Sequence, residues 1–174
     1  MIRIPRWGPG TKVKVGERVF EPRAWEYFEL SRRWDISDVV EVDIPLNSMF
    51  VTAHPMIEAD WSKVAIVRGP LIYCIEQIDN EGYDINYLVV KPDEANLRER
   101  YEHHLLNRVI VVEGNGHILE YGPKDEVYQS YNSKQLRFGK KVTFKAIPYC
   151  LWNNRGKTKM YVWFKAITPV SSLS

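Results

Sequence analysis

The chain has 174 residues, of which 45% are apolar and 26% charged, and this composition is typical of a globular protein and excludes a disordered chain. Its 24 basic and 22 acidic residues leave a net charge of +2, so neither nucleic acid nor an acidic membrane is an expected partner. No apolar run approaches about 18 residues and no signal-peptide pattern opens the sequence, so we expect no membrane span and a cytoplasmic location.

Strand signals recur along the whole chain. Residues 11–20 alternate apolar and polar side chains around a Gly-Glu turn, which predicts a hairpin. Residues 39–44 also alternate, with valines on one face and acidic residues on the other, and this pattern predicts a half-buried antiparallel strand. Further strands are expected over residues 25–34, 108–116, 140–149 and 159–167.

One segment differs from this pattern. Residues 91–106 begin with a proline and acidic residues and continue as a mixed charged stretch, which predicts a short surface helix. The expected fold is therefore all-β, an antiparallel β-sandwich or jelly roll with one short surface helix.

The strongest candidate for chemistry is a cysteine and a glutamate in a predicted strand. Cys74 and Glu76 are two positions apart, so their side chains share one face of the strand. A thiolate beside a carboxylic acid is the pairing of a nucleophile with an acid. No histidine neighbours them in the sequence, and strand cysteines are usually buried apolar residues, so a structural role is favoured. We also expect Cys74 and Cys150 to form no disulfide and to hold no metal.

Other site motifs are absent from the sequence. The four histidines show no zinc-ligand spacing, and neither a phosphate-binding glycine loop nor a nucleophile elbow occurs. No catalytic, cofactor-binding or metal-binding residue is therefore assigned. The tryptophans allow two interpretations, core residues or an exposed face that stacks on sugar rings, and the core is favoured for each of them. They are Trp7, Trp25, Trp34, Trp61, Trp152 and Trp163.

Four segments together carry a likeness to a known family. The most specific is KVAIVRGPLIYCIEQIDN (63–80), which contains Arg-Gly-Pro-x-x-Tyr-Cys-x-Glu, and the others are IRIPRW (2–7), LSRRWDISDVVEVDIPL (30–46) and IPYCLWNNRGKTKMYVWF (147–164). In order and spacing they resemble the C-terminal region of glycoside hydrolase family 127, the β-L-arabinofuranosidase family. The chain departs from the family pattern at Ser37, where a glycine is usual, and at Cys150, where a second tyrosine is usual.

The resemblance implies a role without catalysis. Enzymes of this family place a zinc-bound cysteine nucleophile and a glutamate acid/base in a helical (α/α)6 barrel, which is followed by β-sandwich domains. No residue of this chain matches the barrel motifs, so we expect a non-catalytic C-terminal β-sandwich part that supports the barrel, holds no cofactor itself and is inactive alone. The parent reaction would be the retaining hydrolysis of terminal β-L-arabinofuranosides. The alternative is a stand-alone carbohydrate-binding module.

The resemblance also implies domain boundaries and partners. Residues 8–140 would form one sandwich, residues 1–7 and 141–168 would be strands of a second, incomplete sandwich, and residues 169–174 would be a frayed tail. Residues 159–167 would then lie beside Ile2 to Trp7 and leave an apolar patch. The expected partners are a catalytic barrel domain or chain, a second copy, or a glycan. Structural roles are expected for Arg68, Gly69, Pro70, Tyr73, Cys74, Glu76, Trp152, Asn154, Arg155 and Trp163.

Overall fold

The hairpin expected near the start of the chain is present in the computed structural model. Strands β2 (Lys12–Val15) and β3 (Arg18–Phe20) pair antiparallel. Gly16 begins the turn between them with a φ of +59°, a conformation that favours glycine. The other strands of this region are β1 (Ile2–Arg3) and β4 (Tyr27–Phe28), which pair with each other, and β5 (Val40–Asp43), which pairs with β2.

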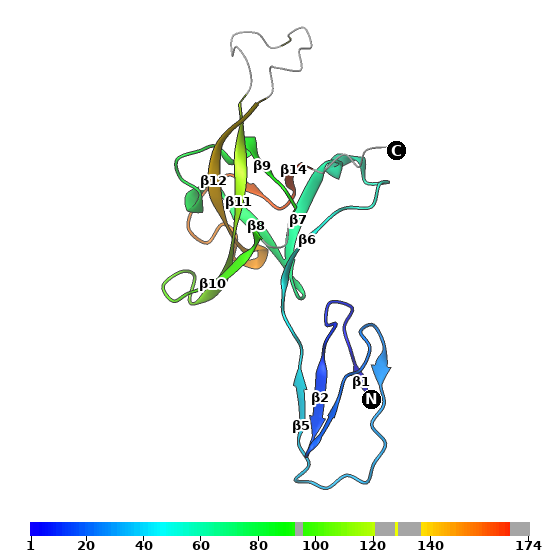
Figure 1. The fold of residues 1–174 in the computed structure, drawn as a ribbon. Coiled ribbons are helices and arrows are strands. Elements are labelled where there is room, and N and C mark those ends of the chain that lie inside the picture. Colours follow the sequence, from blue (N-terminus) through cyan, green and yellow to red (C-terminus); the bar gives the residue numbers. More distant parts are fainter. Residues whose placement is uncertain (93–95, 121–127, 129–136, 168–174) are drawn as a thin grey trace. The chain divides into compact units, whose positions relative to one another are not determined.

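The chain divides into two units (Figure 1). Unit 1 comprises Met1–Asn47 and Arg68–Pro70, and unit 2 comprises Ser48–Val67 and Leu71–Ser174. The structure describes residues 1–92, 96–120, 128 and 137–167. In these ranges, no helix combines the length and the apolar character needed to cross a membrane.

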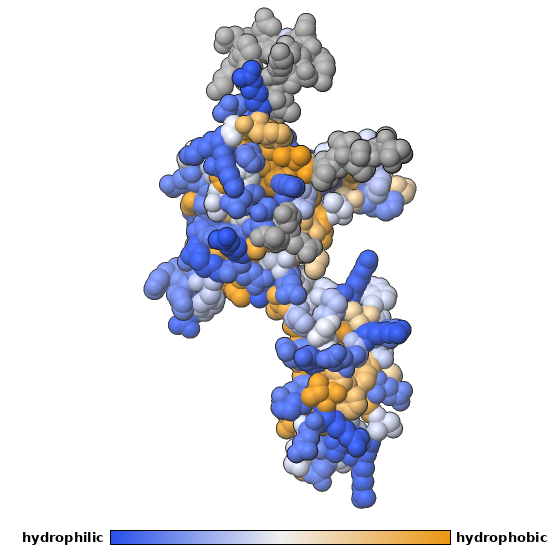
Figure 2. All heavy atoms as spheres, viewed as in Figure 1, coloured by the Kyte–Doolittle hydropathy of each residue, from blue (hydrophilic) through white to orange (hydrophobic). Residues whose placement is uncertain are grey.

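Unit 1 has a small core with one open side. Val13 and Val15 of β2 are buried, and their cross-strand partners on β5 are Val42 and Val40. These two β5 valines are 41% and 36% exposed, so the strand is present but the expected half-burial is wrong, because β5 is the edge strand of its sheet. Apolar side chains are visible on the surface of this unit in Figure 2. A groove of about 450 Å³ is lined by Met1, Ile2, Leu30, Trp34, Val40 and Val42.

The described residues of unit 2 are built on one nine-stranded sheet. Its path runs β13-β8-β12-β11-β9-β14-β7-β6, β10 pairs with β11, and an additional pairing of β7 with β8 closes six strands into a ring. The pairing of β14 with β9 is parallel, and the pairings of β10 with β11, β11 with β12 and β9, β8 with β12 and β13, and β7 with β14 are antiparallel. The elements are β6 (Ser48–Val51), η1 (Glu58–Asp60), β7 (Lys63–Arg68), β8 (Leu71–Glu76), η2 (Gln77–Asp79), η3 (Ile85–Tyr87), β9 (Leu88–Val90), β10 (Arg98–Glu102), β11 (Val109–Glu120), β12 (Arg137–Pro148), η5 (Tyr149–Leu151), β13 (Met160–Tyr161) and β14 (Phe164–Ala166).

Alternation along β8 separates two apolar clusters. Tyr73 and Ile75 belong to the main core of unit 2, together with Phe144 of β12 and Phe164 of β14. Cys74 belongs to a second cluster, because successive strand residues point to opposite faces. The all-β class with mainly antiparallel pairing is confirmed.

The helix predicted over residues 91–106 is wrong. Arg98–Glu102 is strand β10, paired antiparallel with β11, while residues 93–95 lie outside the described part of the chain. Arg100 of β10 donates to Glu113, a diagonal neighbour on β11, through Nε at 3.2 Å and Nη2 at 2.5 Å. Cross-strand pairs of opposite charge stabilise an exposed strand that contains few apolar residues, which its sequence alone did not reveal.

The expected grouping of residues 1–7 with 141–168 is also wrong. β12 and β13 pair with β8, β14 pairs with β7 and β9, and the partner of β1 is β4. Three apolar residues of 160–164 are covered within unit 2, because Phe164 joins the main core while Met160 and Val162 pack against the Cys74 cluster, whereas Tyr161 stays 37% exposed. The expected tail, 169–174, lies outside the described residues.

Candidate functional site

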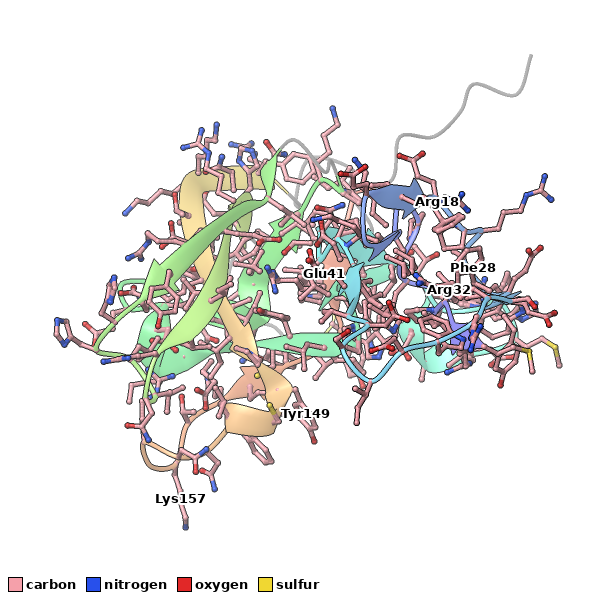
Figure 3. The ribbon with its side chains drawn as sticks, turned by 90° about the horizontal axis from the view of Figure 1, so that it is seen from below. Arg18, Phe28, Arg32, Glu41, Tyr149 and Lys157 are labelled. Carbon is pink, nitrogen blue, oxygen red and sulfur yellow. The ribbon has the colours of Figure 1, made fainter. Side chains whose placement is uncertain are left out.

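Cys74 and Glu76 are both buried on the face of β8 that points away from the main core. Cys74 is fully buried and Glu76 is 1% exposed. β13 runs beside this end of the strand, with Met160 paired to Glu76. The segment between β12 and β13, where Figure 3 labels Tyr149 and Lys157, supplies the residues that contact Glu76.

Glu76 is one carboxylate of a buried ion triad. Arg155 Nη2 donates to Glu76 Oε2 at 2.7 Å, and Arg155 Nη1 donates to Asp79 Oδ1 at 2.7 Å. Arg155 Nη2 also donates to the second oxygen of Asp79. The backbone N–H of Asn153 donates to Glu76 Oε1 at 3.2 Å. Both oxygens of the Glu76 carboxylate are therefore occupied by protein donors.

The electrostatics of this cluster oppose acid–base and nucleophilic chemistry. Burial raises the pKa of Cys74 from 9.0 to about 12, and the nearby charges of Glu76 and Asp79 add to the shift. The thiol is therefore protonated at neutral pH, and only a thiolate is an effective nucleophile. The hydrogen bonds that Arg155 donates to Asp79 and Glu76, the one to Asp79 most, raise the pKa of Arg155, which keeps the guanidinium charged.

The cluster does not fit a metal site either. Across the described residues, no group of three or more His, Cys, Asp or Glu side chains is arranged to hold a metal ion. Cys74 and Cys150 are both unbridged, one buried and one exposed. The arrangement is that of a structural clamp, in which Arg155 ties the segment before β13 to the end of β8.

Two further motif residues hold the same segment in shape. Asn154 Nδ2 donates to the carbonyl of Leu151 at 3.0 Å. Trp152 stacks on Tyr149 with an interplanar angle of 7° and ring centroids 6.1 Å apart, and both rings are partly exposed. Tyr73, on the opposite face of β8, is 1% exposed and its hydroxyl donates to the carbonyl of Ile110 at 2.9 Å.

The Arg-Gly-Pro turn belongs to unit 1, whereas the Glu76 clamp belongs to unit 2. Gly69 has a φ of +54°, and a methyl group there would lie 2.3 Å from Leu46 Cδ2. Glycine is therefore required for both its conformation and its size. Arg68 and Pro70 flank it, and the structural roles expected for these two residues stay a prediction.

The core interpretation of the tryptophans is wrong. None of the six is buried: four are exposed by 39–67%, while Trp7 and Trp163 are intermediate. In unit 1, Arg6 lies over the Trp25 ring at 5.7 Å and Arg32 over the Trp34 ring at 5.2 Å. Cationic side chains thus cover part of the aromatic surface, and valine, isoleucine, tyrosine and phenylalanine fill the cores.

The sequence of this region matches a known protein family. The description of the matching family is "Glycoside hydrolase family 127 C-terminal domain", and the match covers residues 48–165, which is more than half of the chain. The chain belongs to glycoside hydrolase family 127. The matched region begins where unit 2 begins, at Ser48, and contains the whole Glu76–Arg155 clamp.

Named relatives in family 127 are much longer than this chain. A non-reducing end β-L-arabinofuranosidase from Bifidobacterium longum is 30% identical over 93% of this chain and 25% of its own length. The crystal structure of a family 127 β-L-arabinofuranosidase from Geobacillus stearothermophilus T6 is 31% identical, with a TM-score of 0.80 over 95% of this chain and 26% of that one. A second structure, titled a glycoside hydrolase, is 28% identical with a TM-score of 0.83, over 95% of this chain and 27% of that one. The chain therefore spans about a quarter of the length of these relatives.

The departure from the family 127 pattern at Ser37 has a local explanation. The Ser37 backbone N–H and hydroxyl both donate to Asp35 Oδ1, at 3.1 and 2.9 Å. These hydrogen bonds lower the pKa of Asp35, the backbone one most. Asp38 accepts from the Asp35 backbone N–H at 2.7 Å. Serine thus closes this turn with its own side chain, where glycine would rely on backbone freedom.

Sequence reasoning missed the polar residues that complete the Glu76–Arg155 clamp. Asp79 is the second carboxylate, and Asn80 is 2% exposed with a fully satisfied amide. Asn80 Nδ2 donates to the carbonyls of Glu76 and Lys145, and its Oδ1 accepts from the Lys145 backbone N–H and the Tyr83 hydroxyl. The available signal was an Asp-Asn pair directly after a buried strand, which is typical of a turn with internal hydrogen bonds.

Proposed function

We propose that this chain is the non-catalytic C-terminal β part of a family 127 glycoside hydrolase and that it supports a catalytic (α/α)6 barrel. The observation that carries the proposal is the state of its cysteine and glutamate. Cys74 is buried with a raised pKa, and both Glu76 oxygens are held by Arg155 and Asn153. Neither group is available to a substrate. The relatives' further length, about three quarters of each, leaves ample sequence for a separate catalytic domain.

The reaction of the whole protein is inferred from its relatives. Two of them carry the name β-L-arabinofuranosidase, and the Bifidobacterium longum enzyme acts at the non-reducing end. We therefore propose retaining hydrolysis of terminal β-L-arabinofuranosides as the parent activity, with the family's zinc held by the barrel. The described residues of this chain do not fit such a zinc, since the Cys74 thiol is protonated and no ligand cluster surrounds it.

The open side of unit 1 supports a buttressing role. The groove lined by Val40, Val42 and Trp34 is apolar, and β5 has a free edge beside it. Fully burying one large apolar side chain contributes about 1.5–3 kcal/mol, so covering this groove would stabilise an assembly substantially. The proposed cover is the remainder of the hydrolase; a second copy of this chain is the alternative when the barrel is absent.

Co-expression with a family 127 barrel segment tests the supporting role. The expected result is that the two chains co-purify and that the barrel's activity toward a nitrophenyl β-L-arabinofuranoside depends on this chain. Val42→Asp places a charge in the groove and should abolish co-purification. Val19→Asp is the matched control, because Val19 is 55% exposed and pairs with Lys14 on the other face of the same sheet. Co-purification that tolerates both variants equally would contradict the proposed surface.

A further inference from the structure

A second concave site lies in unit 2 and shares no residue with the Glu76 clamp. It is a cavity of about 310 Å³ between the η3–β9 segment and the β13–β14 segment, with Lys63 of β7 at one side. Its apolar lining includes Ile85, Leu88 and Phe164, which are at most 5% exposed and belong to the main core. The cavity is therefore anchored on a packed core, and its size is at the lower end of the range of small-ligand sites, about 300–1,000 Å³.

Aromatic rings and hydrogen-bonding groups form the rest of the lining. Tyr87 and Tyr161 are 43% and 37% exposed, and Trp163 is half-buried. Exposed rings of this kind, each with a polar edge, offer stacking faces that remain wetted. The remaining lining residues are Asn86, Lys63 and Lys165.

Hydrogen bonds hold several of these groups in place before any ligand arrives. The Tyr161 hydroxyl donates to Asn86 Oδ1, which ties the ring to η3. The Asn86 side-chain nitrogen donates to no other described residue, so it is available to an acceptor. Lys63 Nζ donates to the carbonyl of Ala59 at 2.5 Å. A preorganised site loses less conformational entropy on binding.

From this combination we propose that the cavity binds a saccharide. A sugar ring has an apolar C–H face, which fits the rings of Tyr161 and Trp163, and a rim of hydroxyl groups, which fits the Asn86 amide and the lysine ammonium groups. Lysine and the asparagine NH₂ donate, and sugar oxygens accept. No carboxylate lines the described cavity, although Lys63 Nζ also lies 3.6 Å from Asp60 Oδ1, so both a neutral sugar and one that carries a carboxylate, such as a uronide, are tested. The site adds a binding function that is independent of the proposed support of a barrel.

NMR titration of the full 174-residue chain tests the site through its tryptophan indole signals. Trp163→Phe assigns the Trp163 signal, and the probes are neutral arabino- and xylo-oligosaccharides and, separately, oligogalacturonides. The expected result is a saturable shift of the Trp163 signal with at least one probe class, while the signals of exposed Trp61 and Trp152 stay unmoved. Comparison of the two probe classes shows whether hydroxyl or carboxylate oxygens of the sugar contact the lysines.

Variants in the lining complete the test. Tyr161→Ala should weaken binding about tenfold, the scale of one lost aromatic contact. Tyr161→Phe and Lys165→Met are milder and keep the test valid if the alanine variant misfolds, and Tyr101→Ala, an exposed tyrosine of β10 outside the cavity, should leave binding unchanged. Absence of any shift at Trp163 with both probe classes at millimolar concentration would overturn the proposal, as would shifts confined to Trp61 or Trp152.

Discussion

Removing Arg155 should destabilise unit 2 strongly, because it leaves two carboxylates without their cation. Glu76 and Asp79 side chains are 1% and 6% exposed, whereas the Arg155 side chain is 22% exposed. Breaking a buried ion pair by deleting one partner costs about 3–5 kcal/mol, and the partial access of water to Arg155 places the expected loss near the lower value, about 3 kcal/mol. Arg155→Met is the suitable change because it keeps much of the aliphatic stem.

Urea unfolding followed by circular dichroism measures this loss, and hydrogen exchange of the β8 and β13 amides locates it in unit 2. Lys159→Met is the matched control, since it breaks an ion pair with Asp84 at 2.7 Å whose side chains are 52% and 35% exposed. Exposed pairs contribute little, so the control should unfold close to the parent protein. A loss for Arg155→Met no larger than that of the control would refute the interpretation of this cluster as a structural clamp.

Four further outcomes follow from the same structure. Gly69→Ala should lower the free energy of unfolding more than Gly82→Ala, by more than about 1 kcal/mol, because both have positive φ but only Gly69 also lacks space for a methyl group; calorimetry of both variants checks this. In the native protein iodoacetamide should modify exposed Cys150 and spare Cys74, and two thiols should be alkylated after unfolding without reductant; a mass two hydrogens lighter would contradict this. Because burial raises the pKa of Cys74 from 9.0 to about 12, the unfolded chain loses its thiol proton before the folded chain does. Stability should therefore be unchanged by this group below pH 9.0 and fall as the pH rises toward about 12, measured as a falling unfolding midpoint relative to Cys74→Ala. Light scattering across dilution should show self-association of the isolated chain that Val42→Asp reduces; a strict monomer would exclude a second copy as the cover of the unit 1 groove.

Local patterns in the sequence were sufficient for the fold class. The hairpin over 11–20 and the strand near 40–43 follow from period-two alternation and a glycine turn, which act within a few residues. β10 was mistaken for a helix because a charged strand that is stabilised by its neighbour resembles a charged helix when that neighbour is unknown. Exposure was the least predictable property: Val42 alternates like a buried residue but lies on an edge strand.

In the candidate site too, the sequence predicted what depends on neighbouring residues and missed the contacts between residues far apart in the chain. The spacing of Cys74 and Glu76 places them on one strand face, and the absence of a neighbouring histidine favours a structural role. The partner of Glu76 is Arg155, 79 positions along the chain, and no spacing rule connects them. Family resemblance marked both residues as motif members but did not show that they touch. Distant pairing of this kind depends on the antiparallel pairing of β13 with β8, which only the structure reveals.

Turnover by the purified chain alone tests the central claim most directly. Incubation of this chain, with and without added zinc, with a nitrophenyl β-L-arabinofuranoside should release no nitrophenol above the buffer rate, because neither the Cys74 thiol nor the Glu76 carboxylate is available for chemistry. Cys74→Ser and Glu76→Gln should therefore be indistinguishable from the parent chain in this assay. Measurable turnover that either substitution abolishes would contradict the account and make this cluster a catalytic site.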